Sequence, residues 1–208
     1  MIKENGMTLA DTAYEHVRSE ILCGRLPVGS VIAEGAVAEE LGISKTPVRQ
    51  ALQTLRREGL LEVGPRRQVI VRGFSGEHRR EIMDIRIALE SLSVRRACAE
   101  MTIEQIDHLR LLLIRQKRTV DAGDEDGFIE LDEQLHLHIA AAAGLPIVER
   151  FLSQLRGFVR VMRLGTTRPP GHLGQVLAEH ESIVDLIEAR KPARAERALR
   201  EHLQRADY

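Results

Sequence analysis

The sequence predicts a mainly all-α protein, in which one short β-hairpin separates an N-terminal helical region from a longer C-terminal one. Three observations predict this fold class. The composition is 43% hydrophobic and 29% charged, but only 3% aromatic and without Trp, which favours helices. Apolar residues recur at three- and four-residue spacing over most of the chain. Short runs of strand type occur between residues 60 and 71.

The first third of the chain contains three expected helices. They cover residues 9–23, 34–41 and 47–58. Each pattern ends at a glycine, which suits the left-handed backbone that commonly closes a helix, at Gly24, Gly42 and Gly59. For the third helix we expect Thr46 as the N-cap and Pro47 as the first helical residue.

The expected hairpin follows the third helix. Residues 60–63 and 69–71 predict its two strands, and residues 64–68 the turn between them. Helix, turn, helix and hairpin is the order of elements in a winged helix-turn-helix, whose second motif helix enters the major groove of DNA. Because residues 72–77 are typical of a linker, we assign residues 1–73 to this domain and 74–208 to a second one.

The second domain is expected to be an antiparallel helical bundle. Its helices are predicted at residues 77–99, 102–122, 125–143, 146–163, 173–189 and 192–206. Breaks between them contain Gly or Pro, as in the stretch from Gly165 to Gly171.

The third helix carries donors and acceptors of the kind that major-groove recognition needs. Its apolar side is formed by Val48, Leu52 and Leu55, so the opposite side presents Lys45, Thr46, Arg49 and Gln50. Residues 44–72 also hold seven Lys and Arg against two Glu, in a chain of net charge −1. An ordinary solvated helix face would show the same pattern, so the residues alone leave both interpretations open.

Residues 14–72 resemble the DNA-binding domain of the GntR family. The resemblance lies in YEHVRSEILCG (14–24), LPVG (26–29), AEELGISKTPVRQAL (38–52) and EGLL (58–61). It implies that Lys45 and Arg49 read bases, that Ser44, Thr46 and Gln50 support them, and that Arg66 and Arg67 lie on the wing near the minor groove. Two positions depart from the family pattern, since Lys45 and Gln68 stand where Arg and Gly are usual. Lys cannot make the two-pronged contact of Arg, so the preferred operator bases are expected to differ.

Four residues of the second domain form a candidate metal site. Asp132 and His136 are four apart on one expected helix and share a face. His180 and His202 lie on the last two helices, so three helices could direct one carboxylate and three imidazoles to one centre. This ligand set suits zinc, nickel, manganese or iron. By spacing alone, ordinary surface or core histidines remain the alternative.

Residues 77–206 resemble the FCD domain, the ligand-binding domain of the FadR-type branch of the GntR family. The matching segments are EIMDIRIALE (81–90), LDEQLHLHIAAAAG (131–144), EHESI (179–183) and REHL (200–203). The resemblance implies a divalent transition metal on Asp132, His136, His180 and His202, with zinc favoured and nickel, manganese or iron as alternatives. It also implies a small organic acid at the metal, and a domain that serves both effector binding and dimerisation.

Arg86 is the candidate for binding this effector. It lies on the same stripe as Ile82 and Ser93, which is expected to face the interior, where a cation needs a partner. A guanidinium fits a carboxylate of the effector well. The alternative is a pair within the helix with Glu90, four residues on.

The sequence thus predicts a transcription regulator, in the first instance a homodimeric repressor, that binds double-stranded operator DNA under control of an organic acid. A metal sensor is the first alternative, and a metal-dependent hydrolase the second. Against the enzyme, no additional carboxylate stands out at a spacing suited to a general base, so we expect no enzyme. The two cysteines fit no disulfide framework and no run is long enough to span a membrane, so we expect a cytoplasmic protein without a membrane partner.

Overall fold

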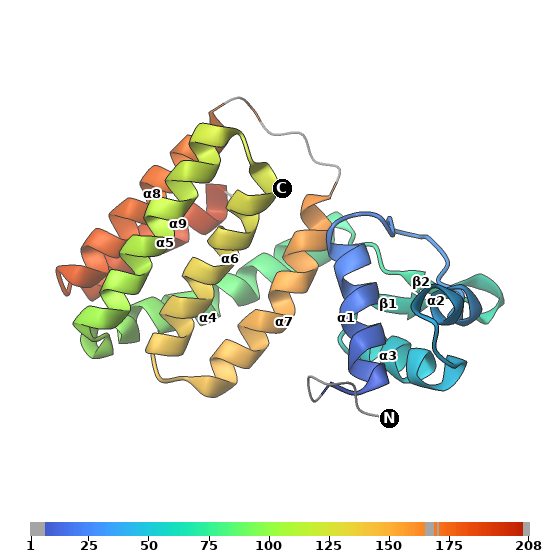
Figure 1. Ribbon diagram of the computed structural model, residues 1–208. Helices are drawn as coiled ribbons and strands as arrows, with labels where there is room; N and C mark the ends of the chain where they lie inside the picture. Colours follow the sequence, from blue (N-terminus) through green and yellow to red (C-terminus); the bar gives the residue numbers. More distant parts are fainter. Residues whose placement is uncertain (1–6, 165–168, 170, 206–208) are drawn as a thin grey trace. The chain divides into compact units, whose positions relative to one another are not determined.

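The computed structural model describes residues 7–164, 169 and 171–205. The contacts within the chain divide it into two compact units, each of which is described separately below. The first unit comprises Met1–Glu77 with Gly157–Gly165, and the second comprises His78–Arg156 with Thr166–Tyr208. Helix α7 therefore contributes residues to both units. Figure 1 shows the mostly helical architecture with one small hairpin, which confirms the predicted fold class.

The first unit contains the expected three helices and hairpin. These are α1 (Leu9–Leu22), α2 (Glu34–Leu41), α3 (Lys45–Arg57), β1 (Leu61–Val63), a 3-10 turn (Pro65–Arg67) and β2 (Val69–Val71). The strands pair antiparallel, with Leu61 opposite Val71 and Val63 opposite Val69. The first expected helix extends one residue less than predicted, since Cys23 is its C-cap, and Gly42 has the predicted left-handed backbone with φ 64°.

The start of α3 differs from the prediction. Ser44, and not Thr46, is the N-cap, so that Pro47 is the third helical residue instead of the first. Proline is tolerated there because the first four N–H groups of a helix have no partner within the helix. The earlier start brings Lys45 and Thr46 into the first turn of the helix.

The core of the first unit lies where α1, α3 and the hairpin meet. Apolar side chains of all three are fully buried, among them Val17, Ile21, Leu52 and Leu55. The end of α7 belongs to the same core, since Val161 is buried in it and Phe158 packs against it. These contacts fix α3 from its apolar side and leave its polar side exposed to solvent.

The second unit is built from long helices that confirm the predicted pattern. These are α4 (Gly76–Glu100), α5 (Ile103–Ala122), α6 (Glu125–Ala142), α7 (Pro146–Arg163, in part), α8 (His172–Glu188) and α9 (Pro192–Arg205). Their boundaries lie within one residue of the expected ones, except that residue 206 and most of the break from 165 to 171 lie outside the described residues. Helix α5 packs against α6 and α8, and α8 packs against α9 (Figure 1).

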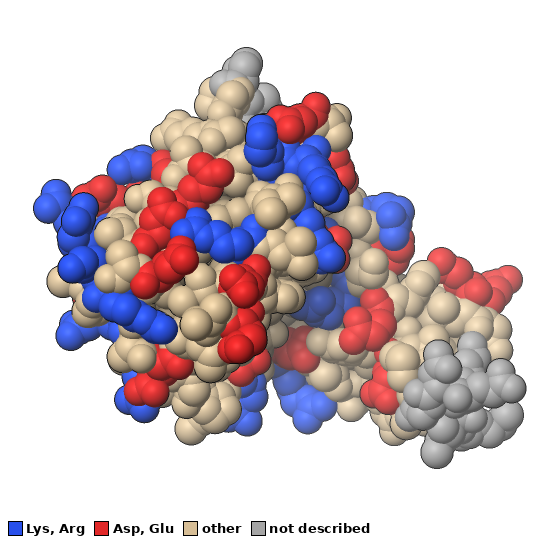
Figure 2. Space-filling view, turned by 60° about the vertical axis from the view of Figure 1, so that its left-hand side comes forward, with Lys and Arg blue, Asp and Glu red and all other residues tan. Residues whose placement is uncertain are grey.

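Local signals explain where these helices begin. Thr102 and Gln105 form a reciprocal capping box at the start of α5, and the carboxylate of Asp124 accepts a hydrogen bond from the Gly127 N–H at the start of α6. No described helix combines the length and apolarity that a membrane span requires. Acidic and basic side chains are interspersed on the face drawn in Figure 2, in keeping with the net charge of −1.

Candidate metal centre and DNA-reading face

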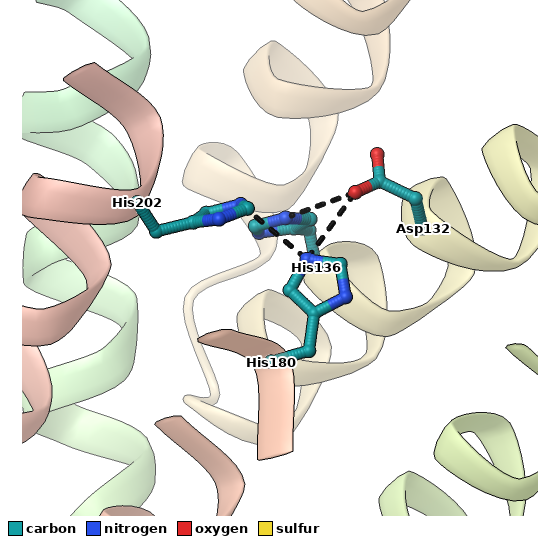
Figure 3. Close-up of side chains that lie close together, drawn as sticks. All are labelled: Asp132, His136, His180 and His202. Carbon is teal, nitrogen blue, oxygen red and sulfur yellow. Dashed lines mark hydrogen bonds and ion pairs between the residues drawn. The ribbon is translucent and has the colours of Figure 1, made fainter. Parts of the chain in front are cut away.

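The four predicted metal ligands meet in the interior of the second unit. Asp132 and His136 lie one turn apart on α6, His180 comes from α8 and His202 from α9, and none is more than 3% exposed. Their ligand atoms all lie within 4.8 Å of one another. Asp132 Oδ1 is 3.3 Å from His180 Nε2 and 3.7 Å from His136 Nε2, and the Nε2 atoms of His180 and His202 are 3.3 Å apart (Figure 3).

Each imidazole of the cluster has an oxygen on its outer side. His180 Nδ1 is 2.9 Å from the amide oxygen of Gln116, and His202 Nδ1 is 2.8 Å from the carboxylate of Glu179. His136 Nδ1 is 2.6 Å from the carboxylate of Glu90. An oxygen at Nδ1 favours the proton on that nitrogen, which leaves the Nε2 lone pair for a metal. Sequence spacing gave no sign of Gln116 or Glu179 as partners of the histidines, and it pointed to Glu90 only as a partner of Arg86.

Burial favours the neutral form of His180 and His202. It lowers the pKa of His180 to about 4, although the nearby carboxylate of Asp132 opposes the shift, and it also lowers the pKa of His202. Burial disfavours the charge on Glu179, but hydrogen bonds from His202 and Arg205 outweigh it and lower the pKa of Glu179 to about 2. Neutral imidazoles beside a carboxylate are the protonation states that metal coordination requires.

The arrangement of the four residues, and not only their residue types, fits a metal ion. With Nδ1 protonated on both rings, the Nε2 lone pairs of His180 and His202 face each other, and a cation between them relieves their repulsion. His136 Nε2 is buried and makes no hydrogen bond with any described residue. Two ligands that are each about 2.0–2.2 Å from one zinc ion lie at most about 4.4 Å apart. The three separations given above satisfy this limit, and the remaining ones, all within 4.8 Å, exceed it by at most about 0.4 Å. The cluster can therefore bind a metal ion.

Arg86 lies beside this cluster and is paired. Its Nε donates to Glu90 at 2.5 Å, and both side chains are buried. The pairing within the helix that was predicted as the alternative is therefore present. Glu90 also faces His136, so it links Arg86 to the metal cluster. Burial disfavours the charge on Glu90, but the positive charges of Arg86 and Arg156 and the hydrogen bond from His136 outweigh it and hold the pKa of Glu90 well below its usual range.

Arg156 on α7 is a second buried cation of the cluster. It is 5% exposed, and its Nε and Nη1 atoms hydrogen-bond to no described residue. Burial lowers its pKa to about 10, against the attraction of Glu90, so it remains charged at neutral pH. Arg86 and Arg156 together balance the charges of Glu90 and Asp132, and the half-buried Glu133 adds one further negative charge near Arg156. A divalent metal ion would leave the interior with an excess of positive charge.

The residues predicted to bind DNA lie on the exposed side of the first unit. Ser44, Lys45, Thr46, Arg49 and Gln50 are all exposed, at or within the first two turns of α3. Arg49 is not free, because it pairs with Glu34 at the start of α2. Glu34 could not be identified from sequence spacing, since the pair joins residues fifteen positions apart on different helices.

Arg66 and Arg67 form the exposed tip of the hairpin. Both have a positive φ, 59° and 61°, which costs a non-glycine residue on the order of 1–3 kcal/mol. Gln68, which replaces the usual glycine of the resembled family, has an extended backbone with φ −73° and ψ 148°. The hairpin thus places its left-handed residues at the two arginines, and position 68 does not require glycine.

Comparison with known proteins assigns both parts of the chain to families. A family model described as "Bacterial regulatory proteins, gntR family" matches residues 9–71. A model described as "FCD domain" matches residues 81–205, which include the four residues of the metal cluster.

Curated relatives match along nearly the whole chain. The HTH-type transcriptional repressor RspR of Escherichia coli is 28% identical over 92% of this chain and 84% of its own length. A probable D-xylose utilization operon transcriptional repressor of Paenarthrobacter nicotinovorans is 31% identical over 94% of this chain and 86% of its own length. Among solved structures, E. coli McbR/YncC shares the fold with a TM-score of 0.85 at 24% identity, covering 96% of this chain and 95% of the other.

Proposed function

Because this chain belongs to the GntR family of bacterial transcription regulators, with a C-terminal FCD domain, we propose that it is a repressor whose affinity for operator DNA is controlled by a small organic acid bound at the metal cluster. We place the boundary between its DNA-binding and effector-binding domains at residues 73 and 74. Repression is supported by two relatives that are described as transcriptional repressors. Such a regulator acts on the chromosome, so we place it in the cytoplasm.

The DNA-binding part of the proposal rests on α3 and the hairpin. Helix α3 enters the major groove, where Lys45 and Arg49 read bases and Ser44, Thr46 and Gln50 contact phosphates and base edges. Arg66 and Arg67 reach the minor groove from the hairpin. Two half-sites of an operator are read by paired recognition helices, so the active form is a homodimer that assembles through the helical domain.

The effector part of the proposal is supported mainly by the charge of the buried cluster. Zinc is the favoured ion for one carboxylate and three imidazoles, with nickel, manganese or iron as alternatives. A bound divalent ion provides a Lewis-acidic position for a carboxylate oxygen. Arg156, whose Nε and Nη1 atoms bond to no described residue, provides the second contact, and Arg86 helps to set the charge of the cluster. An acid anion would offset the excess positive charge.

Helix α7 supports a route from the acid to the DNA-binding region. Arg156 is the last residue that α7 contributes to the second unit, and the next residues, from Gly157 on, belong to the first. There, Phe158 packs against Phe74, and Arg160 donates a hydrogen bond to the backbone oxygen of Leu22. An acid that binds Arg156 therefore contacts α7. The C-terminal end of this helix is part of the core that holds α3 in place. The acid then changes operator affinity to the extent that it binds one conformation of the protein, the one that binds the operator or the one that does not, more tightly than the other.

A regulator that senses the metal itself is the second candidate, and the buried, complete ligand set favours it. If the metal is the signal, metal alone switches operator affinity. If the metal is permanently bound and serves as the anchor for the acid, only an acid switches operator affinity. The hydrolase alternative is not retained, because the family is one of transcription regulators.

Footprinting on the DNA upstream of its own gene tests the DNA-binding role. We expect protection of a site with two half-sites, and we expect Arg49→Ala or Lys45→Ala to weaken binding to this operator by about 5- to 150-fold, the equivalent of about 1–3 kcal/mol for a base contact. Binding to random DNA is expected to change much less.

Arg57→Ala is the matched control, because Arg57 is an exposed cation at the other end of α3. Equal losses on operator and random DNA in the Arg49 and Lys45 variants would show that these residues touch only phosphate. Absence of sequence-specific protection at physiological salt would contradict the proposed function as a whole.

A further inference from the structure

Glu34 is an acidic residue among the cations that are proposed to read DNA. It is the first residue of α2, and its carboxylate accepts hydrogen bonds from Arg49 on α3: from Nε at 3.0 and 3.1 Å and from Nη2 at 2.9 Å. This contact is made along one side of the guanidinium. The two N–H groups of Nη1 and the second N–H of Nη2 are not used by it, and they form the outer edge that can grip a guanine.

Lys45 also lies beside the first turn of α2. A Cβ atom built on Gly35 would be 3.6 Å from Cε and 3.8 Å from Nζ of Lys45, so the lysine side chain runs over the residue that follows Glu34. Any longer side chain at position 35 would compete with Lys45 for this space. Both proposed base readers therefore meet at the first turn of α2, around one carboxylate.

We propose that Glu34 is a positioning residue for operator recognition: it holds Arg49 side-on, in a conformation suited to a base, and its negative charge disfavours phosphate at the same place. This inference rests on the proposed role of α3 in DNA recognition. Specificity is the difference between the affinity for the operator and the affinity for random DNA, and Glu34 changes both. The ordered Arg49 loses less side-chain freedom on binding the operator, whereas a phosphate that approaches Arg49 on random DNA meets the carboxylate.

A purely structural role is the alternative. An acidic residue in the first turn favours a helix through the partial positive charge at its N-terminus, and the N-cap of α2, Ala33, makes no side-chain hydrogen bond. In that case, loss of the charge would destabilise α2 and weaken binding to all DNA alike. The two roles thus differ in the ratio of operator affinity to random-DNA affinity.

A double-mutant cycle on the full-length protein separates them. Fluorescence anisotropy measures the dissociation constants for the operator and for random DNA of equal length, in the wild type, Glu34→Gln, Arg49→Ala and the double variant. We expect Glu34→Gln to lower the operator-to-random affinity ratio by about two- to fivefold, the size that exposed ion pairs have. In the Arg49→Ala background we expect the same change to alter the ratio less than twofold. Glu39→Gln, the same charge change on the exposed side of α2, is the control.

Three results would overturn the inference. They are an unchanged ratio in Glu34→Gln, an equal loss on both DNAs together with a lower thermal midpoint, and an effect of Glu34→Gln that persists in full without Arg49. Each leaves the proposed function standing as long as Arg49→Ala lowers the ratio by itself. If Arg49→Ala does not, the proposed role of Arg49 as a base reader fails first, and with it the premise of this inference.

Discussion

Replacing Glu90 by glutamine is expected to lower the free energy of unfolding by about 3–5 kcal/mol, which is the usual result of removing one partner from a buried ion pair. Glu90 lies at the centre of the buried charges: it accepts from Arg86, faces Nδ1 of His136 and attracts Arg156. Without its charge, two buried guanidinium groups lose the nearest anion. Equilibrium unfolding in urea, with a chelator present so that metal binding does not contribute, measures this loss.

Glu81→Gln is the control for this variant, because Glu81 is an exposed residue on the same helix. We expect it to change the free energy of unfolding by less than about 0.5 kcal/mol. A loss below about 1 kcal/mol in Glu90→Gln would be typical of an exposed pair. It would mean that water reaches Glu90 in solution, so that the buried charges would not favour an acid at the metal cluster.

Replacing His180 by alanine is expected to weaken metal binding by at least about 100-fold, since even the outer-side partners of ligand imidazoles are typically worth about 10- to 100-fold. His180 is fully buried and its Nε2 is 3.3 Å from both Asp132 Oδ1 and His202 Nε2, so no other described side chain can replace it at the centre of the cluster. Metal analysis of the purified protein and competition with a chromogenic chelator measure the affinity.

The control for His180→Ala is His138→Ala. His138 lies on α6 two residues from His136, but its Nε2 pairs with the backbone oxygen of Gln105, away from the cluster. Its loss is expected to leave the metal content unchanged. Thermal unfolding with and without metal controls for misfolding. We expect metal to raise the thermal midpoint of the wild type and of His138→Ala, but not that of His180→Ala. Equal metal content in all three proteins would exclude this cluster as the binding site.

Much of the fold could be predicted because the chain marks its helix ends with glycine, proline and capping residues. Gly42 and Gly123 close α2 and α5 in left-handed conformations, and Thr102 caps α5. The N-cap of α3 was misplaced because Thr46-Pro47 also matches a common helix start. Sequence spacing could not reveal that Pro47 occupies a later position in the first turn.

The metal ligands could be predicted only in part from spacing. Asp132 and His136 share a face of one helix, but His180 and His202 join them through the packing of α8 and α9, which the resemblance to the FCD domain supplied. The partners Gln116 and Glu179 depend on the same packing. Neither periodicity nor resemblance identified Glu34, because its role depends on the angle between α2 and α3.

The measurement that tests the proposed regulator most directly is an anisotropy titration of the operator with metal-loaded protein and a panel of small mono-, di- and tricarboxylic acids. At least one acid is expected to change the operator dissociation constant by about 5- to 150-fold, the usual range of coupling between two sites. The effect is expected to disappear when a chelator removes the metal, and in Arg156→Met. A switch driven by metal alone, with no response to any acid, would contradict the proposal and establish a metal sensor.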